Sequence, residues 1–233
     1  MKLQKRPFEV HLPLEQVPMR KVRFAVELLD AVTLSRVSEG VKVVAEGILG
    51  GPIVNSGGVF VWLKDHVGDL QRITIDSRTL PYEDATLLPT DLEDPLTTIE
   101  LSPSVSYPFS FGITGLRGRL IESRFFSSQG PTPVRNAAVH LRWLDVDDVW
   151  QEAPTISHTD ENGAFAAVLR LAPNQSPHLD AGDTVTVRVS ANRDQGIPRN
   201  SNDLKLVQGR IADPATFEGG RDALTFAWDE LQP

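Results

Sequence analysis

The chain has 233 residues, of which 40% are hydrophobic and 23% charged, and its formal net charge at pH 7 is −8. These values are ordinary for a globular protein of one large or two modest domains, and they argue against wholesale disorder. The acidic balance disfavours a general role in gripping nucleic acid, whose phosphates need a basic surface. The absence of cysteine excludes structural disulfides, thiolate metal sites and cysteine nucleophiles.

Residues 1–20 combine three prolines with apolar side chains at alternate positions, Phe8, Val10, Leu12 and Leu14. Because proline cannot donate to a sheet ladder, we expect an extended N-terminal arm rather than a central strand. Such an arm packs either on its own domain or on a neighbouring subunit. The basic residues in and just after it are interpreted as a solvated surface rather than a patch for nucleic acid.

The basic N-terminus lacks the continuous apolar stretch of a signal peptide, so we expect none. No later run approaches the roughly 20 apolar residues of a membrane span, so we expect no membrane insertion. We therefore expect a cytoplasmic protein, unless a route independent of a signal peptide exports it.

A first domain is predicted over residues 21–106. Its strands are predicted from alternating or short apolar runs at residues 22–29, 41–45, 59–63, 70–77 and 96–101. Turn signals separate these runs, among them the glycine pairs at 50–51 and 57–58. Residues 78–95 carry three prolines and five acidic side chains and are predicted to form a long loop.

A packed junction is predicted at residues 107–113. The surrounding stretch is rich in serine and proline, but it also holds Tyr107, Phe109 and Phe111. A flexible linker would not carry three aromatic side chains. We therefore predict a short connection that packs against one or both domains and gives a fairly fixed inter-domain angle.

A second domain is predicted over residues 114–233, with strands at 116–121, 138–144, 155–159, 164–171, 184–189, 204–207 and 223–228. The two halves echo each other. In each, a glycine turn with a neighbouring asparagine precedes an apolar strand, and a phenylalanine follows two residues after the glycine, at Phe60 and Phe165. No segment has sustained helical periodicity with caps. The sequence therefore predicts an all-β fold of two tandem antiparallel β-sandwich domains.

The second half resembles a known family. The order GRL, PVRNAAVHL, TDENGAF and GDTVTVRVSA, over roughly residues 114–192, resembles the carboxypeptidase regulatory-like domains. The resemblance implies a transthyretin-like (prealbumin) sandwich, although the family's aromatic ending is replaced here by SANRD. The whole chain, through residues 55–63 and 107–120, also resembles a type of bacterial two-domain protein. Some of these are encoded near phage-tail-like contractile injection genes.

Catalytic and metal-binding patterns are weak. The five histidines form neither an HxH nor an HExxH pair, and no serine lies in GxSxG, so we predict no catalytic, cofactor-binding or metal-binding residue. Asp145, Asp147 and Asp148, with Asp160 and Glu161, could supply oxygen ligands to calcium, but they lack the EF-hand spacing. They are interpreted as solvated acidic loops. Asp160, Asn162 and Gly163 are expected to satisfy turn geometry.

The aromatic residues divide into core and candidate surface positions. Trp62 and Trp143 lie in apolar strand patterns and are predicted to be buried. Exposed aromatics mark protein contacts more often than sugar platforms, unless several line up. The candidate protein-contact residues come from the loops and from the arm. They are Phe125, Phe126 and Trp150 in loops, and Phe8, Val10 and Leu12 in the arm.

These features lead to a functional hypothesis. We expect a non-enzymatic structural or adaptor subunit that forms a homo- or hetero-oligomer with other protein subunits, in a phage-tail-like particle assembled in the cytoplasm. The arm and the 78–95 loop would contact neighbours. The alternative is a carbohydrate- or surface-binding accessory module that uses Trp150. A third hypothesis, an unrecognised hydrolase, would depend on His158 or Asp160.

Overall fold

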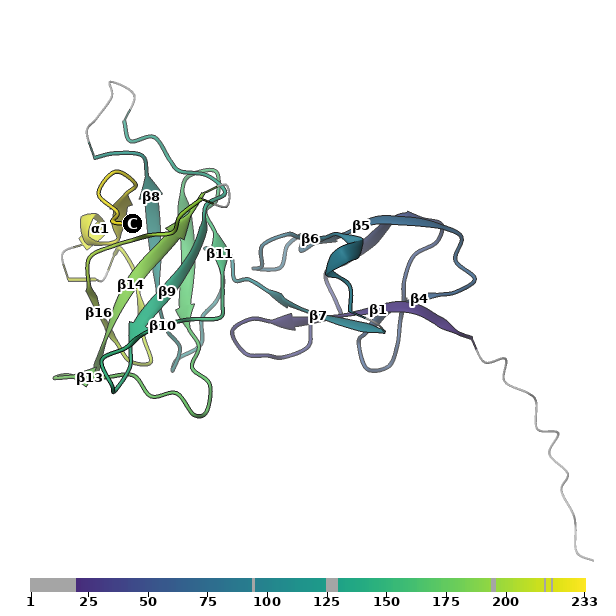
Figure 1. The fold of residues 1–233 in the computed structure, drawn as a ribbon, viewed down its shortest axis with the longest axis horizontal. Helices are drawn as coiled ribbons and strands as arrows, with labels where there is room; N and C mark the ends of the chain where they lie inside the picture. The colour runs from purple at the N-terminus through teal and green to yellow at the C-terminus, as the bar shows by residue number, and fades with distance from the viewer. Residues whose placement is uncertain (1–19, 94, 125–129, 194–195, 216, 219) are drawn as a thin grey trace, which may run out of the picture.

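The structure is a computed structural model that describes residues 20–233 except 94, 125–129, 194–195, 216 and 219. It is nearly all β, and two groups of sheets enclose two separate hydrophobic cores (Figure 1). The described helical elements are one 3₁₀ turn (η1, Pro89–Asp91) and one short helix (α1, Gly220–Ala223). The predicted all-β sandwich fold is confirmed. No helix in the described part of the chain is long and apolar enough to cross a bilayer.

The first domain packs two sheets against each other, with strand orders β3-β4-β1-β7 and β2-β5-β6. Their bounds are β1 (Val22–Asp30), β2 (Lys42–Ile48), β3 (Ile53–Val54), β4 (Phe60–Leu63), β5 (Gly68–Asp76), β6 (Ala85–Leu87) and β7 (Leu96–Leu101). The alternation in β1 places Phe24, Val26 and Leu28 in the core. Trp62, fully buried on β4, stacks on Phe24 with ring centroids 4.7 Å apart.

Two details of the first domain differ from the sequence-based expectation. β7 runs parallel to β1, with Ala25 opposite Leu96, whereas an antiparallel arrangement was expected. Residues 78–95 are not one loop, because they contain the 3₁₀ turn η1 and the strand β6. β6 pairs with β5. Leu87 on β6 packs against the core, and such a short strand carries too little alternation to be recognised.

The second domain packs a larger sheet against a smaller one. The larger has the order β10-β9-β14-β13, with β11 on β9 and β15 and β16 on β14. The smaller has the order β12-β8-β17, with β18 also on β8. The bounds are β8 (Thr114–Ile121), β9 (Ala138–Leu144), β10 (Trp150–Glu152), β11 (Ser157–His158), β12 (Ala164–Leu169), β13 (Leu179–Asp180), β14 (Thr184–Asn192), β15 (Arg199–Asn200), β16 (Leu204–Val207), β17 (Ile211–Ala212) and β18 (Thr225–Ala227).

The core of the second domain lies between these sheets. Trp143 on β9, Phe165 on β12 and Val187 on β14 are each 1% exposed or less. Both β17 and β18 pair with β8 in the parallel direction, so β8 is bonded to three other strands. β8 is therefore the central strand of the smaller sheet.

One turn geometry recurs three times in the described residues. In each turn the side-chain oxygen of the first residue accepts hydrogen bonds from the backbone N–H of the third and fifth, at distances between 2.8 and 3.0 Å. The fourth residue has a positive φ. The first residues are Asn55, Asp145 and Asp160, and the fourth are Gly58, Asp148 and Gly163. The echo in the sequence therefore reflects a shared Asx turn, and Asp160 has the turn role expected for it.

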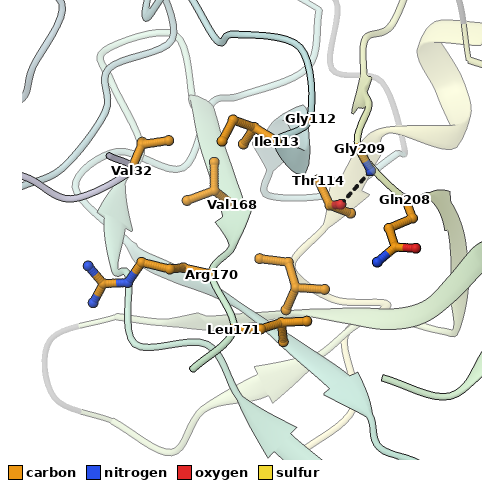
Figure 2. A pocket seen from close by; sticks show the side chains of 10 residues that line it. Val32, Gly112, Ile113, Thr114, Val168, Arg170, Leu171, Gln208 and Gly209 are labelled. Carbon is orange, nitrogen blue, oxygen red and sulfur yellow. Dashed lines mark hydrogen bonds between the residues drawn. The ribbon is translucent and has the colours of Figure 1, made fainter. Parts of the chain in front are cut away.

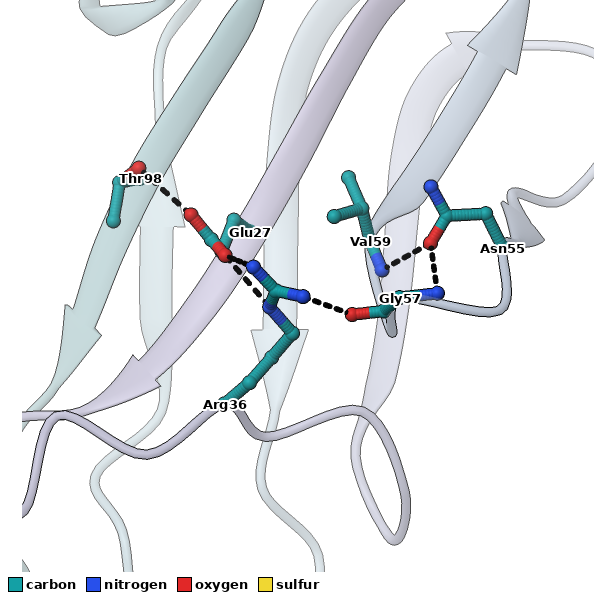
Figure 3. Close-up of polar contacts among 6 residues, drawn as sticks. All are labelled: Glu27, Arg36, Asn55, Gly57, Val59 and Thr98. Atoms are coloured by element: carbon teal, nitrogen blue, oxygen red, sulfur yellow. Dashed lines mark hydrogen bonds and ion pairs between the residues drawn. The ribbon is translucent and has the colours of Figure 1, made fainter.

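A polar cluster braces the first domain on the side of β1 and β7 (Figure 3). The Arg36 guanidinium donates to the Glu27 carboxylate of β1 and to the carbonyl oxygen of Gly57, in the turn after β3. The second oxygen of Glu27 accepts from the Thr98 hydroxyl of β7 at 3.3 Å. The loop that carries Arg36 is thereby fastened to two strands and a turn.

Candidate functional site at the inter-domain junction

A buried carboxylate lies where β1 meets the junction. Asp30, the last residue of β1, is 4% exposed. Its Oδ1 accepts from the backbone N–H groups of Val32 at 2.7 Å and Thr33 at 3.1 Å. Its Oδ2 accepts from the hydroxyls of Tyr82 at 3.0 Å and Tyr107 at 2.5 Å. A carboxylate can be buried at little cost only when it is hydrogen-bonded in this way.

The two tyrosines are held in their protonated form. Burial, with the Asp30 charge and hydrogen bond adding to it, raises the pKa of Tyr82 to about 12. The same causes raise the pKa of the Tyr107 hydroxyl well above its ordinary value. Both hydroxyls therefore remain donors to Asp30 throughout the physiological pH range.

Arg117 of β8 binds the segment between β7 and β8, residues 102–113, which we call the linker. Its Nε donates to the Val105 carbonyl at 2.9 Å and its Nη2 to the Tyr107 carbonyl at 2.7 Å. The guanidinium also lies 5.1 Å from the ring centroid of Phe109 and 3.3 Å from the Asp213 carboxylate. The planar, five-donor guanidinium suits this fork-like contact with two carbonyls.

The three linker aromatics do not behave alike. Tyr107 is buried and Phe109 half-buried, with ring centroids 4.8 Å apart. Phe111, in contrast, is 93% exposed. It lies in a turn closed by the bond from the Ile113 N–H to the Ser110 carbonyl.

Hydrogen bonds and ion pairs join the two domains directly. Arg170 donates to the Ala31 carbonyl at 3.2 Å and forms an ion pair with Glu100 at 2.8 Å. The carboxylate of Glu83 accepts from the backbone N–H of His158 at 2.7 Å and lies 3.0 Å from its Nδ1. The two hydrophobic cores share no residue. The relative position of the domains therefore depends on specific hydrogen bonds rather than on a common core.

The first of two hollows at the junction is largely aliphatic (Figure 2). It has a volume of about 510 Å³. Val32 of the first domain, Ile113 of the linker and Val168 and Leu171 of the second domain line it. Arg170 is the charged residue of this lining, and its guanidinium is engaged by Glu100. Thr114 and Gln208 add polar groups to the lining, and the Thr114 hydroxyl is engaged by the N–H of Gly209.

The second hollow, of about 710 Å³, is lined by acidic residues. Each of its carboxylates has a partner in the chain: Glu83 has His158, Glu100 has Arg170, Asp84 has Ser77, and Asp160 has its own turn. These carboxylates are therefore committed to structure.

His158 links the second domain to Glu83 of the first. The hydrogen bond to Glu83 raises the pKa of His158, while burial opposes that effect. The Glu83 carboxylate lies against Nδ1 of His158, so this ring nitrogen is engaged in the contact between the domains. In the described ranges, no group of three or more His, Asp or Glu side chains is arranged to hold a metal ion.

Of the predicted contact residues, Phe8, Val10, Leu12, Phe125 and Phe126 lie outside the described residues. Trp150 lies on β10 and is half-buried. The Arg188 guanidinium covers its ring, 4.1 Å from the centroid, and is itself paired with Asp203 at 2.6 Å. The ring face under Arg188 is therefore occupied. Trp62 and Trp143 are buried, as predicted.

Sequence reasoning missed Asp30, Tyr82 and Arg117. The only local signal was a charged residue ending an apolar strand, and the partners of Asp30 lie 52 and 77 residues away. Comparison with protein-family models, curated proteins and solved structures gave no match to this chain.

Proposed function

We propose that this protein is a non-enzymatic structural or adaptor subunit that brings protein subunits together. The observation that carries the proposal is the junction. Tyr107 is bonded through its hydroxyl to Asp30 in the first domain and through its carbonyl to Arg117 in the second. Two domains joined in this way form a stiff spacer, as an adaptor requires, and the hydrogen-bonding groups at the junction are used in making it stiff.

An exposed apolar tip supports the proposal. Leu49 and Val67 are 73% and 68% exposed, and they lie side by side because the Leu49 N–H donates to the Val67 carbonyl at 2.8 Å. We call this pair the apolar tip. β1 runs from this end of the first domain to Asp30 at the junction, so the tip lies at the end remote from the second domain (Figure 1). Contiguous exposed apolar patches mark protein contacts, and this pair would form the centre of such a patch.

The two resemblances in the sequence extend the proposal. The likeness to bacterial two-domain proteins, some of them encoded near contractile injection genes, favours a subunit of a phage-tail-like particle, and the carboxypeptidase regulatory-like resemblance of the second domain favours a sandwich without a catalytic role. The carbohydrate-binding alternative is disfavoured, because Arg188 covers the Trp150 ring on which a sugar would stack.

The experiment is the native mass of the full-length protein by light scattering, alone and after purification from its own host. We expect a defined oligomer or a stoichiometric complex with other protein subunits. A monomer at every concentration, with no stoichiometric protein partner from the host, would overturn the proposal. Specific glycan-array binding that is lost on Trp150→Ala would replace it with the alternative.

A further inference from the structure

The described chain begins beside the apolar tip. Lys21 accepts through its carbonyl from the N–H of Lys64 at 2.8 Å, and Arg23 donates to the His66 carbonyl at 3.0 Å. Residues 21–23 therefore run along the loop that leads to Val67. The segment before residue 20 is consequently tethered at the end of the first domain that exposes Leu49 and Val67.

We propose that residues 7–14 of one copy of this chain cover the apolar tip of a second copy, and that the exchange is reciprocal. The inference rests on the proposed function and names one partner for it, namely the chain itself. It assigns the tip as the binding surface and the alternating segment PFEVHLPL as its occupant.

The chemistry of the segment fits the tip. In an extended segment, Phe8, Val10 and Leu12 lie on one side, because successive side chains alternate. That apolar side matches two exposed aliphatic side chains. Two exposed carboxylates, Asp65 in the loop and Asp69 on β5, lie two residues before and after Val67. The basic residues at positions 5 and 6 directly precede the apolar segment, so the charges are also complementary.

The direction of the chain favours a second copy over the same copy. The start of β1 lies at the end of the first domain that is remote from the second domain (Figure 1). The five residues 15–19 span at most about 20 Å between residues 14 and 20. They contain Pro18 and no glycine, so a reversal onto the tip of the same copy is disfavoured. Because tether and tip lie at the same end, two copies that meet tip to tip exchange segments across a two-fold axis and close as a dimer.

The first test compares Leu49→Asp with Ile197→Asp by light scattering over a range of concentrations. Ile197 is 77% exposed, on the second domain, and provides a matched control for adding a charge to an exposed aliphatic position. We expect the wild type and Ile197→Asp to be dimers, and Leu49→Asp to weaken dimerisation at least tenfold. Matching far-ultraviolet circular dichroism spectra of the three proteins check that they are folded. A monomeric wild type, or a dimer that Leu49→Asp leaves unchanged, would overturn the inference.

The second test is complementation between two variants that are each monomeric. One variant lacks residues 1–14 but keeps the tip, and the other is Leu49→Asp and keeps the segment. Mixed together, they should form a heterodimer, because one intact segment meets one intact tip. Failure to associate would show that the segment does not act between copies. A protein that remains in complex with other subunits of its host would still satisfy the proposed function, so the two ideas fail separately.

Discussion

The Tyr107 hydroxyl donates to the Asp30 carboxylate at 2.5 Å, and this bond fastens the linker to the end of the first strand. The carbonyl of the same tyrosine accepts from Arg117 of β8 at 2.7 Å. One linker residue is thus bonded to both domains, and it is 6% exposed. Bending at the linker has to break one of these two hydrogen bonds. Because Tyr107 is shielded from water, the broken bond is not replaced by one to solvent, which makes bending costly.

Tyr107→Phe should loosen the junction. The substitution keeps the ring and removes one donor to a buried carboxylate, which should lower the free energy of unfolding by about 1.5–3 kcal/mol. Urea unfolding measures that change, and small-angle X-ray scattering should record a broader distribution of inter-domain distances. Tyr82→Phe is the matched control, because it removes the other hydroxyl from the same oxygen but lies within the first domain. Identical scattering from the two variants would contradict the pivot role of Tyr107.

Local alternation is strong in the long strands of this fold, and those strands could be predicted. Residues 96–101 and 138–144 were predicted with the bounds that β7 and β9 have. Pairing partners could not be predicted, because the parallel ladder between β1 and β7 joins residues about 70 positions apart and leaves no local pattern. β13 and β15, of two residues each, are too short to show any periodicity.

The candidate site was harder to predict than the fold. The aromatic content of the linker predicted a packed connection, and Tyr107 and Phe109 are packed there. The acceptor of the Tyr107 hydroxyl, Asp30, could not be predicted. Nothing near Asp30 in the sequence indicates tyrosine partners 52 and 77 residues away. Similarly, the sequence left His158 open as a catalytic candidate. Its contact with Glu83, 75 residues away, is visible only in the folded chain.

The ion pair between His158 and Glu83 should make stability depend on pH. The pKa of His158 is raised in the folded protein, so the pair contributes fully below the unfolded value of about 6.5 and is lost as pH rises through the folded pKa. The His158 side chain is 47% exposed, which limits the effect to about 1 kcal/mol or less. His158→Ala should therefore destabilise the protein more at about pH 5.5 than at about pH 8.5, by urea unfolding.

Glu83→Gln is the partner variant for this pH measurement. It removes the carboxylate charge, so His158→Ala on that background should have nearly the same effect at both pH values. Nuclear magnetic resonance titration of His158 should show its pKa falling towards the ordinary value in Glu83→Gln. An unchanged titration would contradict the assignment of Glu83 as the cause of the shift.

The Asx turn that begins at Asp160 should require an oxygen acceptor but no charge. Asp160→Asn keeps an oxygen that can accept from the N–H groups of Asn162 and Ala164, as Asn55 does in the first domain. Asp160→Ala removes it and should cost about 1 kcal/mol in unfolding free energy. Glu161→Ala, at the exposed next position, controls for a change of net charge. Equal losses for the asparagine and alanine variants would show that the acceptor is unimportant.

Gly163→Ala should be among the more damaging single-methyl additions in the second domain. Gly163 has a φ of 75°, and an added Cβ would lie 2.3 Å from the backbone oxygen of Leu120. Backbone strain and a clash with a fixed backbone atom act together there, so we expect a loss of about 2 kcal/mol or more. Gly182→Ala is the matched control, because its φ of 81° imposes the same strain while no atom lies within 4 Å of the added Cβ. Thermal unfolding should therefore place Gly182→Ala between Gly163→Ala and the wild type, and equal midpoints for the two variants would refute the contribution of the clash.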